Sequence, residues 1–152
     1  LAEKIVAFTG NIRACVLTLV SITFVGSMLI ANDMALLTFL PLGYFVLSTT
    51  DKKKYMSFTF IMQNIAANLG GMLTPFGNPQ NLYLYTKFNI PTGEFMKIMA
   101  LPFVISILLI LGMCWLFVKP EEIRIKKEEV HTDKKRTAIY LLLFALSILL
   151  KY

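Results

Sequence analysis

Two short polar stretches interrupt long uncharged apolar segments of the chain. The first is Ala31-Asn32-Asp33, and the second is the Gly/Pro-rich stretch 70–81, Gly-Gly-Met-Leu-Thr-Pro-Phe-Gly-Asn-Pro-Gln-Asn. Because hydrocarbon offers no water to free backbone groups, such breaks are tolerated at membrane depth only where they are buried in protein or line a cavity. Two breaks close together in sequence are typical of the substrate and ion site of a secondary transporter. Transport is therefore the leading hypothesis.

Helix ends at these breaks would supply ligands for both charge signs. The arm 14–31 would end in free carbonyl groups and the negative end of its helix dipole, which suit a small hard cation. The arm from Met34 and the short helix after Gln80 would present free N–H groups, which suit an anion. A cation and an anion bound side by side at one tip would move together. Glycines in the second break would let ligands approach the backbone closely.

Composition and apolar segments predict an all-α membrane protein. Hydrophobic residues make up 57% of the 152 residues and the mean hydropathy is +0.68, above the share of about 45–50% usual for soluble domains. A membrane-spanning helix needs roughly 20 apolar residues. The uncharged apolar segments are Ala14–Ala31, Met34–Thr50, Tyr55–Thr86, Ile98–Val118 and Thr137–Leu150. We therefore expect a multi-pass protein of the cell (plasma) membrane.

The net charge of +6 does not indicate nucleic-acid binding, because of where the basic residues lie. They cluster between apolar segments, at Lys52–Lys54 and in the segment 119–136, as positive charge does in cytoplasmic loops. The segment 119–136 also holds acidic residues, so we expect a solvated cytoplasmic loop. The expected surroundings are the lipid bilayer, and nucleic acid is excluded as a partner.

Residue types needed for enzyme chemistry are sparse. Cys15 and Cys114 lie in separate apolar segments and are expected to be buried as small hydrophobes. His131, the single histidine, lies in the charged loop, so no nucleophile–base pair and no Cys/His metal cluster can be assembled. We expect no enzyme activity, no cofactor, and no metal beyond a transported or coupling cation.

Charge on both flanks of 14–50 places the two ends of this segment on the same, cytoplasmic side. Two full spans satisfy this, with Asn32-Asp33 capping a helix from Met34, and so does a re-entrant helical hairpin with the same pair at its tip. The residues alone leave both open. Thr92 is expected to cap a brief helix through Lys97. The predicted order is hairpin 14–50, broken helix 55–88, helix 98–118, cytoplasmic loop 119–136 and the start of another helix at 137–152.

The two breaks resemble motifs of the ion transporter superfamily, and above all those of its citrate-transporter-like, divalent anion/sodium symporter branch. Members carry Ser-Asn-Thr at the tip of a re-entrant hairpin, where this chain has Ala31-Asn32-Asp33. They also carry a Gly-Gly-x-x-Thr-Pro-x-Gly-x-Pro-x-Asn loop in a broken helix, which 70–81 matches throughout. The resemblance favours the re-entrant hairpin.

The resemblance implies an architecture of two inverted repeats, each with one hairpin and one broken helix. This chain matches the first repeat only, so it is expected to be one half of a larger transporter whose second repeat belongs to the same polypeptide. A homodimer is compatible with this architecture. The implied function is secondary transport of a small di- or tricarboxylate anion coupled to sodium or protons.

The resemblance also implies site residues. The cation-binding residues are Ser27, Ala31, Asn32 and Gly77, and the substrate-binding residues are Asn32, Asp33, Asn78 and Pro79. Asn32 would touch both ligands, whereas Ala31 can contribute only its carbonyl oxygen. Polar residues on the helix before the loop, Gln63, Asn64 and Asn68, are expected to form interhelical hydrogen bonds.

Asp33 departs from the usual Thr of the signature and leaves the substrate open. A carboxylate beside an anion site must be neutralised by a cation or a proton, which makes Asp33 a candidate coupling group; otherwise it is only a helix cap. Arsenite permeases of the same superfamily also carry Asn-Asp here, and sodium/proton antiporters belong to the group. The alternatives are therefore an arsenite/antimonite efflux permease, a sodium/proton antiporter, or a non-transporting membrane fragment.

Overall fold

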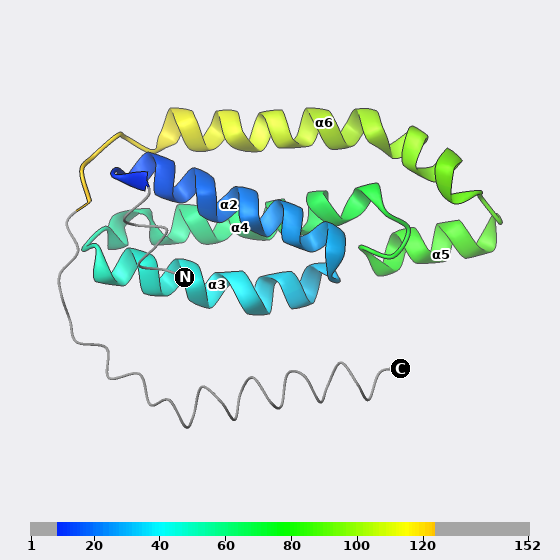
Figure 1. The fold of residues 1–152 in the computed structure, drawn as a ribbon, viewed down its shortest axis with the longest axis horizontal. Helices are drawn as coiled ribbons and strands as arrows, with labels where there is room; N and C mark the ends of the chain where they lie inside the picture. The colour runs from blue at the N-terminus through cyan, green and yellow to red at the C-terminus, as the bar shows by residue number, and fades with distance from the viewer. Residues whose placement is uncertain (1–8, 124–152) are drawn as a thin grey trace, which may run out of the picture.

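The computed structural model describes residues 9–123, which form an all-helical fold (Figure 1). Its elements are α2 (Ile12–Leu29), α3 (Asn32–Thr49), η1 (Lys53–Tyr55), α4 (Met56–Gly70), η2 (Gly71–Leu73), α5 (Pro79–Lys87) and α6 (Thr92–Phe117). Within this part of the chain, β structure is limited to an isolated bridge between Asn11 and Glu122. The all-α prediction is confirmed. Most of the predicted loop 119–136 and the predicted helix 137–152 lie outside the described residues.

Helices α2 and α3 form a hairpin joined by Ile30 and Ala31. Asn11 caps α2, because its side-chain oxygen accepts a hydrogen bond from the Ala14 N–H at 2.8 Å. Ile30 and Ala31 have ψ angles of 150° and 144°, so the chain leaves one helix and enters the next almost at once. In Figure 1 the turn of the hairpin lies near the end of α4, partway along α6.

Helices α4 and α5, with η2 between them, form the broken helix. Helix α4 ends at Gly70, η2 adds one tighter turn, and α5 begins at Pro79 after an irregular segment. Proline suits the first position of a helix because its missing N–H needs no partner there. After α5, Asn89 adopts a positive φ of 47° and turns the chain toward α6.

Helix α6 is longer than the sequence predicted. It begins at Thr92 instead of Ile98 and continues without interruption for 26 residues. The expected cap at Thr92 is wrong, because Pro91 occupies the cap position and Thr92 is the first helical residue. The Thr92 hydroxyl lies 3.0 Å from the Tyr85 hydroxyl instead. By length and composition, α2 and α6 are each able to cross a membrane.

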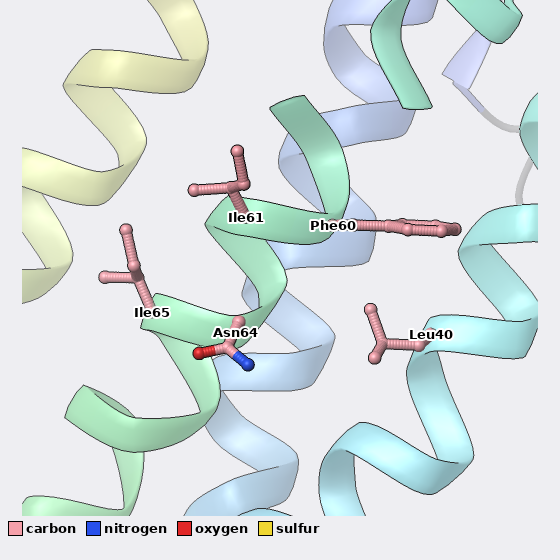
Figure 2. Close-up of a pocket in the computed structure, with 5 residues that line it drawn as sticks. All are labelled: Leu40, Phe60, Ile61, Asn64 and Ile65. Atoms are coloured by element: carbon pink, nitrogen blue, oxygen red, sulfur yellow. The ribbon is translucent and has the colours of Figure 1, made fainter. Parts of the chain in front are cut away.

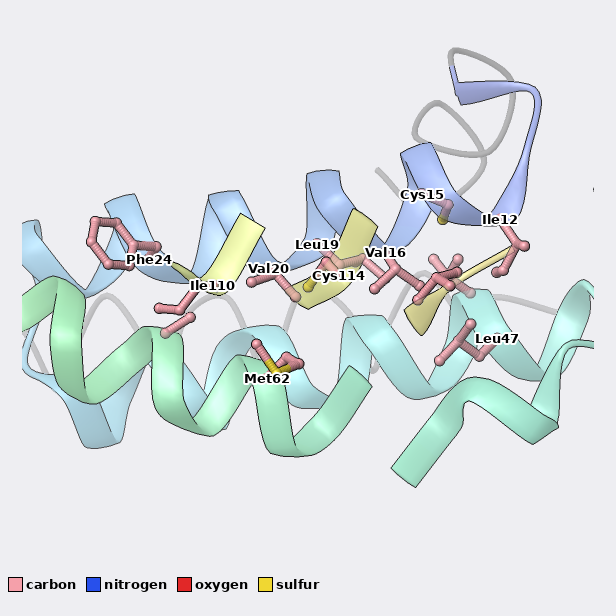
Figure 3. Packing of buried hydrophobic residues seen from close by; sticks show 13 residues of the cluster. Ile12, Cys15, Val16, Leu19, Val20, Phe24, Leu47, Met62, Ile110 and Cys114 are labelled. Carbon is pink, nitrogen blue, oxygen red and sulfur yellow. The ribbon is translucent and has the colours of Figure 1, made fainter. Parts of the chain in front are cut away.

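The apolar core lies along α2, which contacts α3, α4 and α6 (Figure 3). The rings of Phe24 and Phe103 pack with their centroids 4.9 Å apart. Cys15 and Cys114 are free and buried, as predicted. The core residues are Ile12, Cys15, Val16, Leu19, Val20, Phe24, Val46, Leu47, Met62, Ala66, Ile110, Cys114 and Val118. Because lipid is as apolar as these side chains, van der Waals packing rather than exclusion of water holds such a core together in a bilayer.

A buried glutamine, Gln63, links three helices. Its Nε2 donates to Thr23 Oγ1 at 3.1 Å and to the Phe39 carbonyl at 3.0 Å. Its Oε1 lies against Gly43, where an added Cβ would be 2.7 Å away. The interhelical role predicted for Gln63 is confirmed, and glycine at position 43 is what makes room for the amide.

Charged groups hold the end of the bundle opposite the hairpin turn, around Glu121. Its carboxylate accepts hydrogen bonds from Lys52 Nζ at 2.7 Å, Lys54 Nζ at 2.5 Å and the Tyr55 hydroxyl at 2.9 Å. These donors, Lys52 first, lower the pKa of Glu121 to about 2. The Glu121 carbonyl also accepts from the Ile12 N–H at 2.8 Å. The chain after α6 is thus tied to η1 and to the start of α2.

We predict that Glu121→Gln lowers the thermal stability of the protein near neutral pH, because the amide keeps the shape but loses both ion pairs. The folded-state pKa of about 2 lies below the ordinary value of 4.5. The stabilisation from the carboxylate is therefore complete above about pH 4.5 and disappears as the pH falls toward 2. Thermal melts of both proteins in detergent should converge over that range. Glu122→Gln, on the exposed neighbouring carboxylate, is the control, and equal losses in the two variants would contradict the assignment.

Candidate functional site

The hairpin turn places Asn32 and Asp33 in the first turn of α3. The sequence predicted a helix from Met34, but α3 begins two residues earlier and neither polar side chain caps it. The first N–H groups of a helix have no partner within that helix. The N–H of Asn32 donates instead to the carbonyl of Gly77 at 3.2 Å, which joins the hairpin turn to the second break.

Asn81 holds the second break in shape. Its side-chain nitrogen donates to the carbonyls of Met72 at 2.9 Å and Thr74 at 3.3 Å. The N–H of Gly77 also donates to the Thr74 carbonyl, at 3.3 Å. Without these donors the carbonyls of a non-helical segment would be left unpaired. Asn81 is the last residue of the loop motif, but the sequence did not indicate that it would pair the loop carbonyls.

Glycines allow the two breaks to meet at close range. A Cβ on Gly77 would collide with the Gly71 carbonyl, and a Cβ on Gly70 would collide with the Phe24 carbonyl and the Ser27 hydroxyl. At these positions the absent side chain makes room for protein atoms. The end of α4 therefore packs directly on the end of α2.

Three oxygen atoms of the tip and the loop are buried without a hydrogen-bond partner, namely Asn32 Oδ1, Thr74 Oγ1 and Asn78 Oδ1. Such an atom costs about 1–3 kcal/mol unless something binds it. The Asn78 oxygen and the Gly77 carbonyl lie close together, 2.6 and 2.9 Å from the place of a Cβ on Gly71. Amide and carbonyl oxygens are ligands that hard cations prefer. The junction of the two breaks is therefore the candidate functional site.

The remaining predicted site residues lie around this junction. Ser27 is fully buried, and its hydroxyl donates to the Phe24 carbonyl at 2.8 Å. The Ala31 carbonyl accepts the Ala35 N–H at 3.0 Å, which leaves one of its two lone pairs available. Pro79 is exposed at the first position of α5.

Asp33 is exposed, and its side chain makes no capping hydrogen bond. The interpretation of Asp33 as a hydrogen-bonded helix cap is therefore wrong for this structure. Its negative charge still lies beside the positive end of the α3 dipole, where a carboxylate is favourable. The carboxylate is thus held close to the candidate site without being tied to a protein donor at the cap.

The chain is similar to transporters over nearly its whole length. The family described as citrate transporter matches residues 1–151. This chain belongs to that family. It is also 36% identical over 138 residues to an uncharacterized transporter of Methanocaldococcus jannaschii. That match covers 88% of this chain and 37% of the relative, so the chain spans little more than a third of the relative's length. No solved structure matches the chain.

Membership of the citrate transporter family confirms the resemblance inferred from the two breaks. It agrees with an all-helical fold that contains two helices able to span a bilayer. The protein is therefore a membrane protein of a transporter family. Its helical hairpin and broken helix supply the candidate site described above.

Asn68 has a larger part in this site than the sequence indicated. Its Oδ1 accepts a hydrogen bond from Asn32 Nδ2 at 2.9 Å, as expected for an interhelical contact. Its backbone carbonyl also accepts from Asn78 Nδ2 at 3.0 Å. A single residue of α4 thus contacts both breaks. The signal available in the sequence was an amide side chain only two residues before the Gly-Gly pair of the loop.

Asn64 does not link helices through its side chain, contrary to the prediction. Its Oδ1 accepts from Asn68 Nδ2 at 3.3 Å, within α4. It borders an open hollow of about 350 Å³ lined by residues of α3 and α4, and the other lining residues are apolar (Figure 2). These are Leu40, Phe60, Ile61 and Ile65. A hollow with one amide offers little to hold a charged substrate, which favours the junction as the site.

We predict that Gly77→Ala destabilises the protein, because the new Cβ would collide with the Gly71 carbonyl. Overpacking of this kind costs about 1–3 kcal/mol. Thermal melts in detergent measure this loss of stability. Gly112→Ala is the matched control, since a Cβ there meets no atom within 4 Å. Normal stability in Gly77→Ala would show that the two breaks do not pack as described.

Proposed function

We propose that the protein is a secondary active transporter of a small anion of the di- or tricarboxylate class, coupled to sodium or protons. The observation that carries this proposal is the hydrogen bond between the Asn32 N–H and the Gly77 carbonyl, at 3.2 Å. It joins the hairpin turn to the loop of the broken helix, and helices that only anchored the protein in a membrane would need neither interruption. Discontinuous helices that meet in this way are how secondary transporters build binding sites inside the membrane.

The cation would bind among oxygens of the tip and the loop. Asn32 Oδ1 and Asn78 Oδ1 are buried and lack hydrogen-bond partners. The carbonyls of Ala31 and Gly77 each accept one hydrogen bond and retain a second lone pair. Ser27 lies fully buried below the tip. This set supports a small hard cation such as sodium, which takes oxygen ligands.

The anion would bind where two helix N-termini approach the same junction. Helix α3 begins at Asn32 and α5 begins at Pro79, directly after Asn78. The free N–H groups and positive dipole ends of such helices favour carboxylate groups. A cation bound next to them would add to this attraction and would offset the charge of Asp33. Substrate and cation would then bind cooperatively, which is the requirement for coupled transport.

We further propose that the hairpin is re-entrant in the plasma membrane, with its charged end toward the cytoplasm. Arg13 and Lys52–Lys54 lie at that end, as the positive-inside rule requires. Helix α6 has 26 residues, or about 39 Å, whereas α2 has 18 residues, or about 27 Å. Figure 1 shows the hairpin turn partway along α6. Both observations support a turn within the bilayer.

A second inverted repeat of the same polypeptide would complete the site and cover part of the exposed apolar surface. Helix α6 leaves Leu101, Leu108 and Leu116 between 64% and 69% exposed. In the bilayer this surface would face lipid, the second repeat or the partner of a homodimer. The proposal therefore concerns a multi-pass protein in which the described helices form one half of the transport pathway.

Asp33 supports a second candidate, efflux of arsenite or antimonite, or sodium/proton antiport. The carboxylate is exposed beside the junction and makes no capping hydrogen bond. It would therefore be available to take part in proton or cation binding. An additional negative charge there also weakens the case for a substrate with several carboxylates.

We predict that Asn32→Ala reduces uptake at least roughly tenfold while leaving expression nearly normal, because it removes a ligand shared by cation and substrate. The measurement is uptake by proteoliposomes that contain the complete polypeptide. Labelled carboxylates and oxyanions, arsenite included, are tested under separate sodium and proton gradients. Asn64→Ala is the matched control on the apolar hollow. Undiminished uptake in Asn32→Ala would remove the site assignment.

We predict that Asp33→Asn weakens coupling to the cation that neutralises the carboxylate. If that cation is a proton, the variant should lose the pH dependence of transport but keep substrate exchange, which moves no net proton. If it is sodium, sodium activation should weaken, and Asp33→Thr should retain it. Glu94→Gln, an exposed carboxylate in the first turn of α6, is the control. Unchanged pH, sodium and substrate dependence in Asp33→Asn would exclude a coupling role.

A further inference from the structure

Asn68 lies in the last turn of α4, where its exposed side chain contacts Asn32 at the hairpin tip. It accepts a hydrogen bond from Asn32 Nδ2 at 2.9 Å, and its backbone carbonyl accepts one from Asn78 Nδ2 at 3.0 Å. Asn32 is 7% exposed, and its Oδ1 is buried without a partner. Asn78 Oδ1 is likewise buried without a partner. Asn68 therefore holds the nitrogen end of both amides whose oxygen ends are free.

The direction in which the Asn32 amide points is determined by a backbone carbonyl. Asn68 Nδ2 donates to the carbonyl of Asn64 at 2.9 Å, and a carbonyl can only accept. The nitrogen of the Asn68 amide must therefore face Asn64, which leaves its oxygen facing Asn32. That oxygen can only accept as well, so Asn32 must present its nitrogen to Asn68. The oxygen of Asn32 is consequently directed away from Asn68.

The direction of the Asn78 amide is determined directly by one backbone carbonyl, that of Asn68. The carbonyl of Asn68 lies in the last turn of α4, where carbonyl groups have no partner within the helix. Because this carbonyl accepts the hydrogen bond from Asn78 Nδ2, the Asn78 amide must also present its nitrogen to α4. Its oxygen then lies beside Gly71, on the same side as the Gly77 carbonyl.

We propose that Asn68 is a positioning residue, which orients the amides of Asn32 and Asn78 so that both present oxygen to a bound cation. This inference rests on the proposed function in its sodium-coupled form. Asn68 acts through the two amides and need not touch the ion. Outer partners of this kind hold ligand groups in the orientation that binding requires, and their loss typically weakens binding about 10–100-fold.

The test is binding of radioactive sodium to the purified complete polypeptide, measured together with sodium-activated uptake in proteoliposomes. Asn68→Leu and Asn68→Ala remove the side-chain acceptor, so the Asn32 amide is free to rotate. Both should raise the half-saturating sodium concentration about 10–100-fold, with a much smaller change in the maximal rate at saturating sodium. Asn68→Gln keeps both an oxygen acceptor for Asn32 Nδ2 and a nitrogen donor for the Asn64 carbonyl, and it should remain within about threefold of wild type, well below the loss expected from a missing outer partner. Asn64→Leu removes the longer contact of Asn68, at 3.3 Å to Asn64 Oδ1, but keeps the carbonyl that orients Asn68, and it is the matched control.

The outcomes distinguish the positioning role of Asn68 from the sodium site itself. Weakened sodium affinity in Asn68→Leu or Asn68→Ala that Asn68→Gln restores supports the positioning role. Sodium binding that is lost in Asn32→Ala but normal in Asn68→Leu and Asn68→Ala overturns the positioning role, while the sodium site itself is retained. An equal loss of sodium affinity in all three Asn68 variants also overturns the positioning role. A wild-type protein that binds no sodium overturns the sodium site itself, and the inference with it.

Discussion

Every buried backbone group that a helix break releases must find a hydrogen-bond partner. This requirement accounts for most of the polar contacts at one end of the bundle. The first N–H of α3 donates to Gly77, and carbonyls of the loop accept from Asn81. A carbonyl in the last turn of α4 accepts from Asn78. Once these demands are met, three of the five buried side-chain oxygens that lack a partner within the described residues lie at this junction, and the other two belong to Ser48 and Gln63.

The opposite end of the bundle is held by charged and polar side chains instead. There the carboxylate of Glu121 collects Lys52, Lys54 and Tyr55, and the chain beyond α6 is joined to the start of α2. Between the two ends lies an apolar core in which Gln63 is a buried polar link. The helices are therefore fastened at the charged end and along their middle. The junction of the breaks lies at the other end, where glycines let the helices approach closely and three buried oxygens have no protein partner.

The hairpin and the broken helix were predictable because several Gly, Pro, Asn and Asp residues lie next to one another at both breaks, whereas Pro41 and Pro102 lie inside continuous helices. The start of α6 was not, since Pro91 and Gly93 are equally typical of turns and of the first residues of a helix. Side-chain partners were the least predictable part. Asn32 meets Asn68 across 36 positions, and Lys52 meets Glu121 across 69. Such pairs depend on how the helices pack, which no local pattern encodes.

The hydrogen bond between the hairpin tip and the loop uses only main-chain atoms, the N–H of residue 32 and the carbonyl of residue 77. A main-chain bond survives exchange of the side chains around it, provided that glycine remains at the crowded positions. Residues such as Ala31 and Asp33 can therefore vary while the frame that presents them stays in place. Under the proposed function, single substitutions on this frame would change the substrate preference or the coupling ion. The frame can thus be inherited through main-chain atoms of residues 32 and 77 while the chemistry changes through the side chains around them.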